Sequence, residues 1–254
     1  MRNISKFSLA LAVAWAFSLT TSRAQELLPQ VEGFPINGGK FNGASVKAQP
    51  PLHQFESVAN IGVFRTFGDS TGAVPTSDTT PLFTRGGACP PPNVLTPILA
   101  PDGHQVTWGE WNAADGQVIV KCIRSGSLVV VHLSGLIPNG QYSAWVVTFK
   151  APGFNPDPTL PNPPAANAVS AGPLGLQDGS ENGFVADDDG EGEIVGVLPA
   201  GPMSLLHLVT FDGCLTDEVG FQVHIAYHID GTTHGPTQGP PCTWAVQRIF
   251  DFHP

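Results

Sequence analysis

Positive charge is scarce in this sequence. The chain has 11 lysines and arginines against 21 aspartates and glutamates, and the basic residues are scattered along it. Binding to a phosphate backbone requires a basic patch, which this distribution does not supply. We therefore expect no nucleic-acid partner. The acidity is typical of a soluble protein and would also attract cations, and net charge alone does not choose between these roles.

Long apolar runs are also absent after the first two dozen residues. Arg2 and Lys6 precede the apolar run Phe7–Leu19, and Ser22 and Ala24 place small residues before a cleavage site. This pattern predicts a signal peptide over residues 1–24. No later segment is long and apolar enough for a transmembrane helix, so we expect a secreted or periplasmic protein without a membrane span. Cleavage would remove three of the 11 basic residues and no acidic one, which leaves 8 against 21 and a net charge of about −13.

Cysteine is limited to Cys89, Cys122, Cys214 and Cys242, and none of them belongs to a Cys-x-x-Cys pair. A redox motif or a zinc knuckle is therefore not supported. In an exported chain, an even number of cysteines predicts two disulfides, with three connectivities that the sequence does not separate. A bridge between Cys214 and Cys242 would enclose the most histidine-rich part of the chain, and we take it as a working hypothesis.

A sustained apolar period of 3.6 residues is missing, so few helices are expected. Instead, short segments rich in β-branched residues are bounded by Gly, Pro, Asn or Asp, which is the pattern of strands. Residues 55–67 supply a candidate first strand. The other predicted strands are 105–111, 117–124, 127–134, 141–150, 192–198, 204–211, 221–229 and 243–250. Many short strands separated by turns predict an all-β fold, an antiparallel β-sandwich that is immunoglobulin-like, fibronectin-III-like or jelly-roll-like.

Two segments lack the strand pattern. Residues 25–54 carry Gly, Pro, Asn and Gln with little apolar periodicity, which predicts an irregular N-terminal arm or linker. Residues 151–175 form a Pro-rich insertion with few side chains to bury. We therefore expect one β-sandwich domain over residues 55–254, interrupted by this insertion.

One short segment supports the sandwich. The string LSGLIPNGQYSAWVV contains Leu136-x-Pro138-x-x-x-Tyr142. It resembles the corner that precedes a strand in fibronectin type III domains, where a tyrosine hydroxyl hydrogen-bonds back to the chain. The resemblance covers about fifteen residues, and it implies an architecture rather than a family for the whole chain.

The stretch HIAYHIDGTTH places His224, His228 and His234 at the spacing H-x-x-x-H-x-x-G-x-x-H. This spacing resembles the zinc motif of the metzincin proteases, in which the first two histidines lie one helical turn apart. The resemblance implies a glutamate after the first histidine as general base and a methionine turn downstream. Here Ile225 follows the first histidine, and both methionines of the chain lie upstream. A metalloprotease is therefore not expected.

Alternating apolar residues from Phe221 to Ile229 also predict a strand over this stretch, with both histidines on the face opposite the apolar set. At about 3.3 Å per residue, the Cα atoms of His224 and His228 would lie about 13 Å apart, too far to share one ion easily. A helix ending at Gly231 is the alternative.

A strand histidine can still share an ion with histidines on neighbouring strands, whose Cβ atoms lie within about 5 Å across a pair. His207 and His132 are the candidates, which would complete a cluster with His224, His228 and His234. Imidazole ligands suit copper or zinc as the cofactor. The alternative is that these histidines are solvent-facing or hydrogen-bonded structural residues.

An acidic stretch supplies a second candidate site. Asp178, Ser180, Asn182 and Asp189 match the oxygen-bearing positions of a calcium-loop pattern. Oxygen ligands at alternating positions let one loop wrap a hard cation. The match has Asp at the position where a bidentate Glu is usual, and an acidic hairpin turn is the alternative, because Asp-Gly and Asn-Gly also form turns.

No complete catalytic set is present, so the sequence leaves open whether this is an enzyme. The leading hypothesis is an exported, non-catalytic binding or surface module, with or without a bound metal, whose ligand or protein partner is unknown. The alternative is a copper- or zinc-dependent enzyme or a metal carrier that uses the histidine cluster. A structural domain stabilised by calcium is the third hypothesis.

Overall fold

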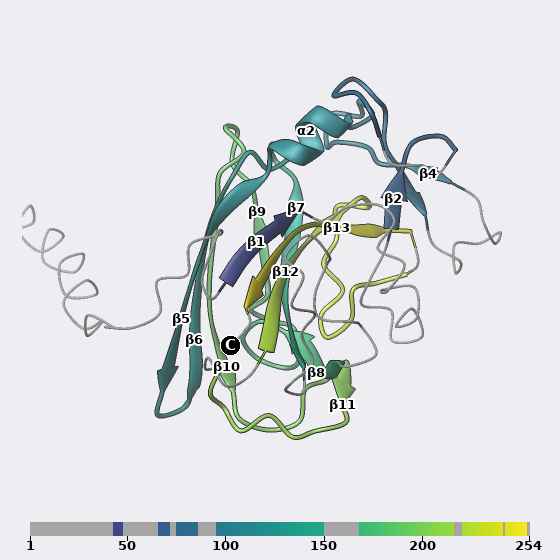
Figure 1. Ribbon diagram of the computed structural model, residues 1–254. Coiled ribbons are helices and arrows are strands. Elements are labelled where there is room, and N and C mark those ends of the chain that lie inside the picture. The colour runs from purple at the N-terminus through teal and green to yellow at the C-terminus, as the bar shows by residue number, and fades with distance from the viewer. Residues whose placement is uncertain are drawn as a thin grey trace, which may run out of the picture. The chain divides into compact units, whose positions relative to one another are not determined.

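Antiparallel strands make up almost all of the regular structure (Figure 1). The structure is a computed structural model, and it describes residues 43–47, 66–71, 75–85, 95–149, 168–215, 220–240 and 242–252. The predicted signal peptide lies outside the described residues. The prediction of an all-β, antiparallel fold is confirmed.

The largest sheet has the strand order β1-β13-β12-β7-β8-β11, with β9 paired to β7. Its strands are β1 (Gly43–Lys47), β13 (Trp244–Phe252), β12 (Gly220–His228), β7 (Gln141–Phe149), β8 (Ala168–Pro173), β11 (Leu206–His207) and β9 (Gly183–Val185). A second sheet has the order β10-β6-β5, and a third has the order β2-β3-β4. Their strands are β10 (Gly192–Pro199), β6 (Gly126–Ser134), β5 (Asp115–Ile123), β2 (Thr66–Gly68), β3 (Phe83–Arg85) and β4 (Thr96–Pro97). Six of the predicted strands are confirmed, as β5, β6, β7, β10, β12 and β13.

Alternation of side chains explains how the β10-β6-β5 sheet buries one of its faces. On β6, Val129, Val131 and Leu133 are buried, whereas His132 between them is exposed. On β10, Gly196 lies so close to Leu174, just after β8, that a Cβ there would crowd the leucine side chain. This close approach packs β10 against the end of β8 in the largest sheet, as facing sheets pack in a β-sandwich.

Strand β12 is buried at all nine of its residues. It lies between β13 and β7, and both of its faces are covered. Apolar residues such as Val223 and Tyr227 alternate with His224 and His228, as predicted, but the histidine face is buried too. Both imidazole rings therefore lie in a dry environment rather than in solvent.

The segment 105–111 was predicted as a strand, and this was wrong. Residues Trp108–Ala113 form α2, the one helix among the described residues. The Thr107 side chain accepts a hydrogen bond from Glu110 N at 3.4 Å, and Glu110 Oε2 accepts one from Thr107 N at 2.7 Å. This capping box satisfies two backbone N–H groups that a first helical turn leaves unbonded, and it outweighs the strand preference of the aromatic residues.

Three other predicted boundaries change. The segment 204–211 contributes only the two residues of β11. Within the predicted arm 25–54, β1 pairs with β13 and extends the sheet edge, and within the predicted insertion 151–175, β8 pairs with β7. Residues 55–65 and 151–167 lie outside the described part of the chain. The cross-strand partners of β1 and β8 are distant in sequence, so local composition did not reveal them.

The tyrosine corner is confirmed. Tyr142 Oη accepts a hydrogen bond from Ile137 N at 2.8 Å and donates one to Gln247 Oε1 on β13 at 2.6 Å. Gln247 Nε2 in turn donates to Trp111 O at 3.1 Å, which ties the sheet to helix α2. The buried hydroxyl thus joins the turn before β7 to two other elements. It supports the predicted architecture without selecting among the named types of sandwich.

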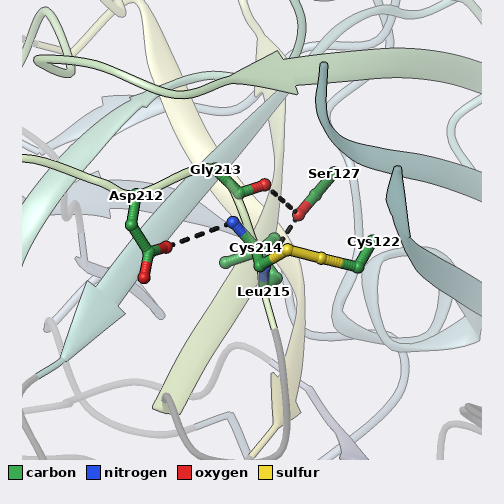
Figure 2. The surroundings of a disulfide bond; sticks show 6 residues. All are labelled: Cys122, Ser127, Asp212, Gly213, Cys214 and Leu215. Carbon is green, nitrogen blue, oxygen red and sulfur yellow. Dashed lines mark hydrogen bonds between the residues drawn. A yellow bond between two sulfur atoms is a disulfide. The ribbon is translucent and has the colours of Figure 1, made fainter. Parts of the chain in front are cut away.

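A disulfide joins strand β5 to the segment that follows β11. Cys122 on β5 is bonded to Cys214, with Cα atoms 5.1 Å apart (Figure 2). Beside it, Ser127 Oγ donates to Gly213 O at 2.9 Å and accepts from Leu215 N at 2.8 Å. The hypothesis of a Cys214–Cys242 bridge is therefore wrong. Cys242 is also disulfide-bonded, and Cys89 lies outside the described residues.

No helix in the described ranges is long and apolar enough to cross a membrane.

Candidate metal centre

The candidate centre lies where β12 ends. His228 is the last residue of the strand, and Gly231 N donates to His228 O at 3.1 Å, which closes a tight turn. Asp230 Oδ1 accepts a hydrogen bond from Thr232 N at 3.1 Å, so the carboxylate orders its own loop. The chain then leads to His234 before it returns as β13. An Asp-Gly turn after a buried strand thus brings three polar side chains together at one end of the sheet.

His228, Asp230 and His234 form a group suited to a metal ion. One ligand atom from each residue lies within 4.8 Å of the other two. His234 Nε2 and Asp230 Oδ2 are 2.9 Å apart. Two donors about 2.0–2.1 Å from one ion lie about 2.9 Å apart at a right angle and about 3.4 Å apart at a tetrahedral angle. The 2.9 Å contact between His234 Nε2 and Asp230 Oδ2 is a hydrogen bond that also has the separation of two ligands at a right angle, and the ligand atom of His228, within 4.8 Å of both, would have to move closer to complete the set.

His228 is held from the strand side. The side chain is 1% exposed, and its Nε2 lies 2.7 Å from Ser143 Oγ on β7. Trp145 Nε1 donates to the same oxygen at 2.7 Å. His228 Nδ1 is buried and has no hydrogen-bond partner in the structure. A buried polar atom without a partner is uncommon and calls for an explanation, such as a bound ion.

The loop that carries Asp230 and His234 is packed in place. A Cβ at Gly239, which has φ +98°, would fall on the His234 ring. A Cβ at Gly179 would likewise fall on the backbone of Gly235, next to His234. The His234 ring therefore lies directly against a glycine backbone, and the loop lies against the segment before β9. Asp230 and His234 remain partly exposed, so the centre opens toward solvent on their side.

Electrostatics favour the form of histidine that binds metals. Burial, opposed by the Asp230 carboxylate and assisted by the His234 ring, lowers the pKa of His228 to about 4. At neutral pH the ring is therefore uncharged, and only an uncharged imidazole has a nitrogen lone pair to donate to an ion.

His224 does not join this group. Its ring is 1% exposed, and its Nε2 lies 2.8 Å from Gln222 Oε1 on the same strand. Burial lowers the pKa of His224 to about 3. Because the segment is a strand, the helical zinc-binding geometry of the metzincins is absent, as predicted. The second and third histidines of the motif converge, and Asp230 takes the position that His224 would have filled.

The other two predicted ligands lie elsewhere. His132 on β6 is exposed and pairs with Glu193 on β10, its direct cross-strand neighbour, at 2.9 Å from Nδ1 to Oε2. His207 is exposed on the short strand β11. The strand order separates both histidines from β12, because β6 belongs to another sheet and β7 and β8 lie between β12 and β11.

The residues of the calcium-loop pattern do not share one loop. Asp178 Oδ1 accepts hydrogen bonds from Ser180 N at 3.0 Å and Ser180 Oγ at 2.7 Å. Strand β9 follows, and Asp189 belongs to the turn between β9 and β10. Asn182 is buried, and its side-chain atoms have no partner. A wrapped calcium loop requires an uninterrupted loop, and β9 interrupts this one.

Two residues of the candidate centre were not predicted from the sequence. Asp230 lies in the histidine stretch itself, and the spacing His-x-Asp-x-x-x-His over 228–234 was the available signal. Ser143 is 85 residues from His228 in sequence, and only the pairing of β7 with β12 brings them together. No local pattern could have revealed that contact.

A scan against protein-family models and a search of the curated proteins found no match for this chain.

Proposed function

We propose that this protein is an exported β-sandwich that binds one divalent transition-metal ion, zinc or copper, through His228, Asp230 and His234. The observation that carries the proposal is the convergence of the three ligand atoms within 4.8 Å of one another. The unpartnered, buried Nδ1 of His228 supports it independently.

The donor set favours this class of metal. Two imidazoles and one carboxylate suit zinc, copper and other first-row transition ions, whereas calcium and magnesium prefer oxygen ligands. A hard cation would gain little from two nitrogen donors. We therefore expect zinc or copper to bind here and calcium not to bind.

The number of ligands bears on what the metal does. Three protein ligands leave at least one coordination position for water or an outside ligand. The partly exposed Asp230 and His234 face solvent, which supports access to that position. A binding module that captures a ligand through its metal is the function that this arrangement supports best. A metal-dependent enzyme is the second candidate, since catalytic zinc sites also keep an open position.

The test is metal titration of the protein without a histidine tag. After removal of metal with EDTA, isothermal titration with Zn²⁺ and Cu²⁺ should give one site per chain, and Ca²⁺ should give none. His234→Ala and Asp230→Ala should each weaken zinc binding by at least about 10–100-fold, because each removes a ligand. Wild-type protein that binds neither zinc nor copper in a 1:1 ratio would refute the proposal.

The chain offers a matched control. His104 lies between two carboxylates, with Asp102 Oδ1 at 2.6 Å from Nδ1 and Glu110 Oε1 at 2.9 Å from Nε2. The two carboxylates lie at opposite nitrogens of one ring, so they cannot share an ion with it. His104→Ala should therefore leave zinc binding unchanged.

Added cobalt with azide would report the open position, since azide changes the cobalt absorption spectrum only where a coordination position is free.

Export is the second part of the proposal. The predicted signal peptide motivates it, and the Cys122–Cys214 disulfide is compatible with an oxidising compartment. Expression of the full chain in a secreting host, followed by fractionation and N-terminal sequencing, tests it. The mature protein should begin at Gln25 in the exported fraction, and an uncleaved chain confined to the cytoplasm would contradict this part.

A further inference from the structure

A row of three hydrogen-bonded side chains leads from the sheet to the candidate metal centre. Trp145 Nε1 donates to Ser143 Oγ at 2.7 Å, and Ser143 Oγ lies 2.7 Å from His228 Nε2. All three side chains are at most 2% exposed. The metal site described above needs only the three ligands, so this row requires its own explanation.

The protons of this row restrict how His228 can act. An indole N–H only donates, so Trp145 occupies one lone pair of the Ser143 oxygen. The Ser143 hydroxyl then still has one proton to donate and one lone pair with which to accept a hydrogen bond. It can donate the proton to His228 Nε2, or it can use the lone pair to accept a proton that Nε2 carries. In a neutral imidazole the first arrangement places the ring proton on Nδ1, and the second leaves Nδ1 with a free lone pair.

Metal coordination chooses between these arrangements. An ion needs a nitrogen without a proton, and ligating histidines usually donate their other N–H to a hydrogen-bond acceptor. With the ion on Nδ1, Nε2–H donates to Ser143 and every polar atom of the ring has a partner, at the cost of turning the Ser143 hydroxyl proton away from the ring. With the ion on Nε2, Ser143 would be displaced and a buried Nδ1–H would remain without an acceptor, which costs about 1–3 kcal/mol.

We propose that His228 binds its metal through Nδ1, and that Ser143, held by Trp145, is the positioning residue that keeps the ring in that orientation. This inference rests on the proposed metal-binding function and adds to it the coordinating atom and the residue that selects it. Ser143 acts through His228 and does not itself contact the ion.

The coordinating atom can be read directly in the wild-type protein. Nuclear magnetic resonance of protein with ¹⁵N-labelled histidine distinguishes a protonated ring nitrogen from a metal-bound one. On addition of one equivalent of Zn²⁺, His228 should show a protonated Nε2 and a zinc-bound Nδ1. The indole N–H resonance of Trp145 should shift as well, because its acceptor Ser143 is hydrogen-bonded to the ring that binds the ion.

Variants test the role of Ser143. Ser143→Ala should weaken zinc binding by about 10–100-fold, the range found when a hydrogen-bond partner of a ligand is removed. Ser143→Thr keeps a hydroxyl and should restore most of the affinity. Thr148→Val is the matched control, because Thr148 lies on the same strand and its buried hydroxyl bonds Ser170 instead. It should leave the zinc affinity unchanged.

The possible outcomes distinguish failure of this inference from failure of the proposed metal-binding function. Zinc that binds 1:1 through Nε2 of His228, or Ser143→Ala that binds zinc as tightly as the wild type, overturns the inference and leaves the metal-binding function standing. A wild-type protein that binds no zinc or copper overturns both. The resonance measurement requires no variant, so it decides the coordinating atom even if Ser143→Ala does not fold.

Discussion

The buried histidine outside the candidate metal centre gives a quantitative prediction about acid sensitivity. His224 is 1% exposed, and its pKa is lowered from 6.5 to about 3 because burial penalises the charged ring. In the unfolded chain the same side chain regains its ordinary pKa. Between these two values the unfolded state binds a proton that the folded state does not, so stability falls as the pH is lowered from about 6.5 toward about 3 and levels off below that.

The size of the effect follows from the two pKa values. Each unit of pH inside this window corresponds to about 1.4 kcal/mol for one group. Between pH 7 and pH 5, His224 alone should lower the free energy of unfolding by about 2 kcal/mol. The substitution His224→Gln removes this titration, so the variant should lose about 2 kcal/mol less than the wild type over the same interval. His228 also titrates, but it does so in both proteins and cancels in the comparison.

Urea unfolding at pH 7, 6 and 5 in the presence of EDTA provides the measurement, and the chelator keeps metal binding out of the comparison. Val223→Ala is the control, because Val223 is the buried neighbour of His224 and cannot titrate. It should lower the free energy of unfolding by roughly 1–3 kcal/mol at every pH, with a curve parallel to that of the wild type. A His224→Gln curve that also runs parallel to the wild type would refute the reasoning.

Three further predictions concern the loop, the corner and the disulfide. Gly239→Ala should strain the backbone and displace the His234 ring, so zinc affinity measured by titration should fall by at least about 10–100-fold. Gly103→Ala is the control, because Gly103 has a similar φ of +90° with open space around it, and this variant should lower stability alone. Tyr142→Phe removes two buried hydrogen bonds and should lower the free energy of unfolding in urea by about 1–3 kcal/mol, and an unchanged midpoint would contradict this. Cys122→Ser opens a bridge between residues 92 apart in sequence and should cost about 4–5 kcal/mol by the same assay, and a variant as stable as the wild type would refute this.

The strands were predictable because their signal is local. On β6, every second residue from Ser127 to Leu133 is buried, and the sequence marks this strand by its run of β-branched residues between Gly126 and Gly135. Helix α2 was missed although its signal was also local. Thr107 and Glu110 have the spacing of a capping box, but the aromatic and β-branched residues around them were taken to indicate a strand.

Within the candidate metal centre, the sequence determined the two histidines and the turn between them, because His228, Asp230 and His234 lie within seven consecutive residues and an Asp-Gly turn brings them together. Tertiary structure alone decided that His224 is enclosed apart from them, that Ser143 lies against His228, and that Cys122 bonds Cys214. Each of these depends on which strands become neighbours. Which strands become neighbours follows from the joint burial of segments far apart in the chain, so no short stretch of residues can predict it.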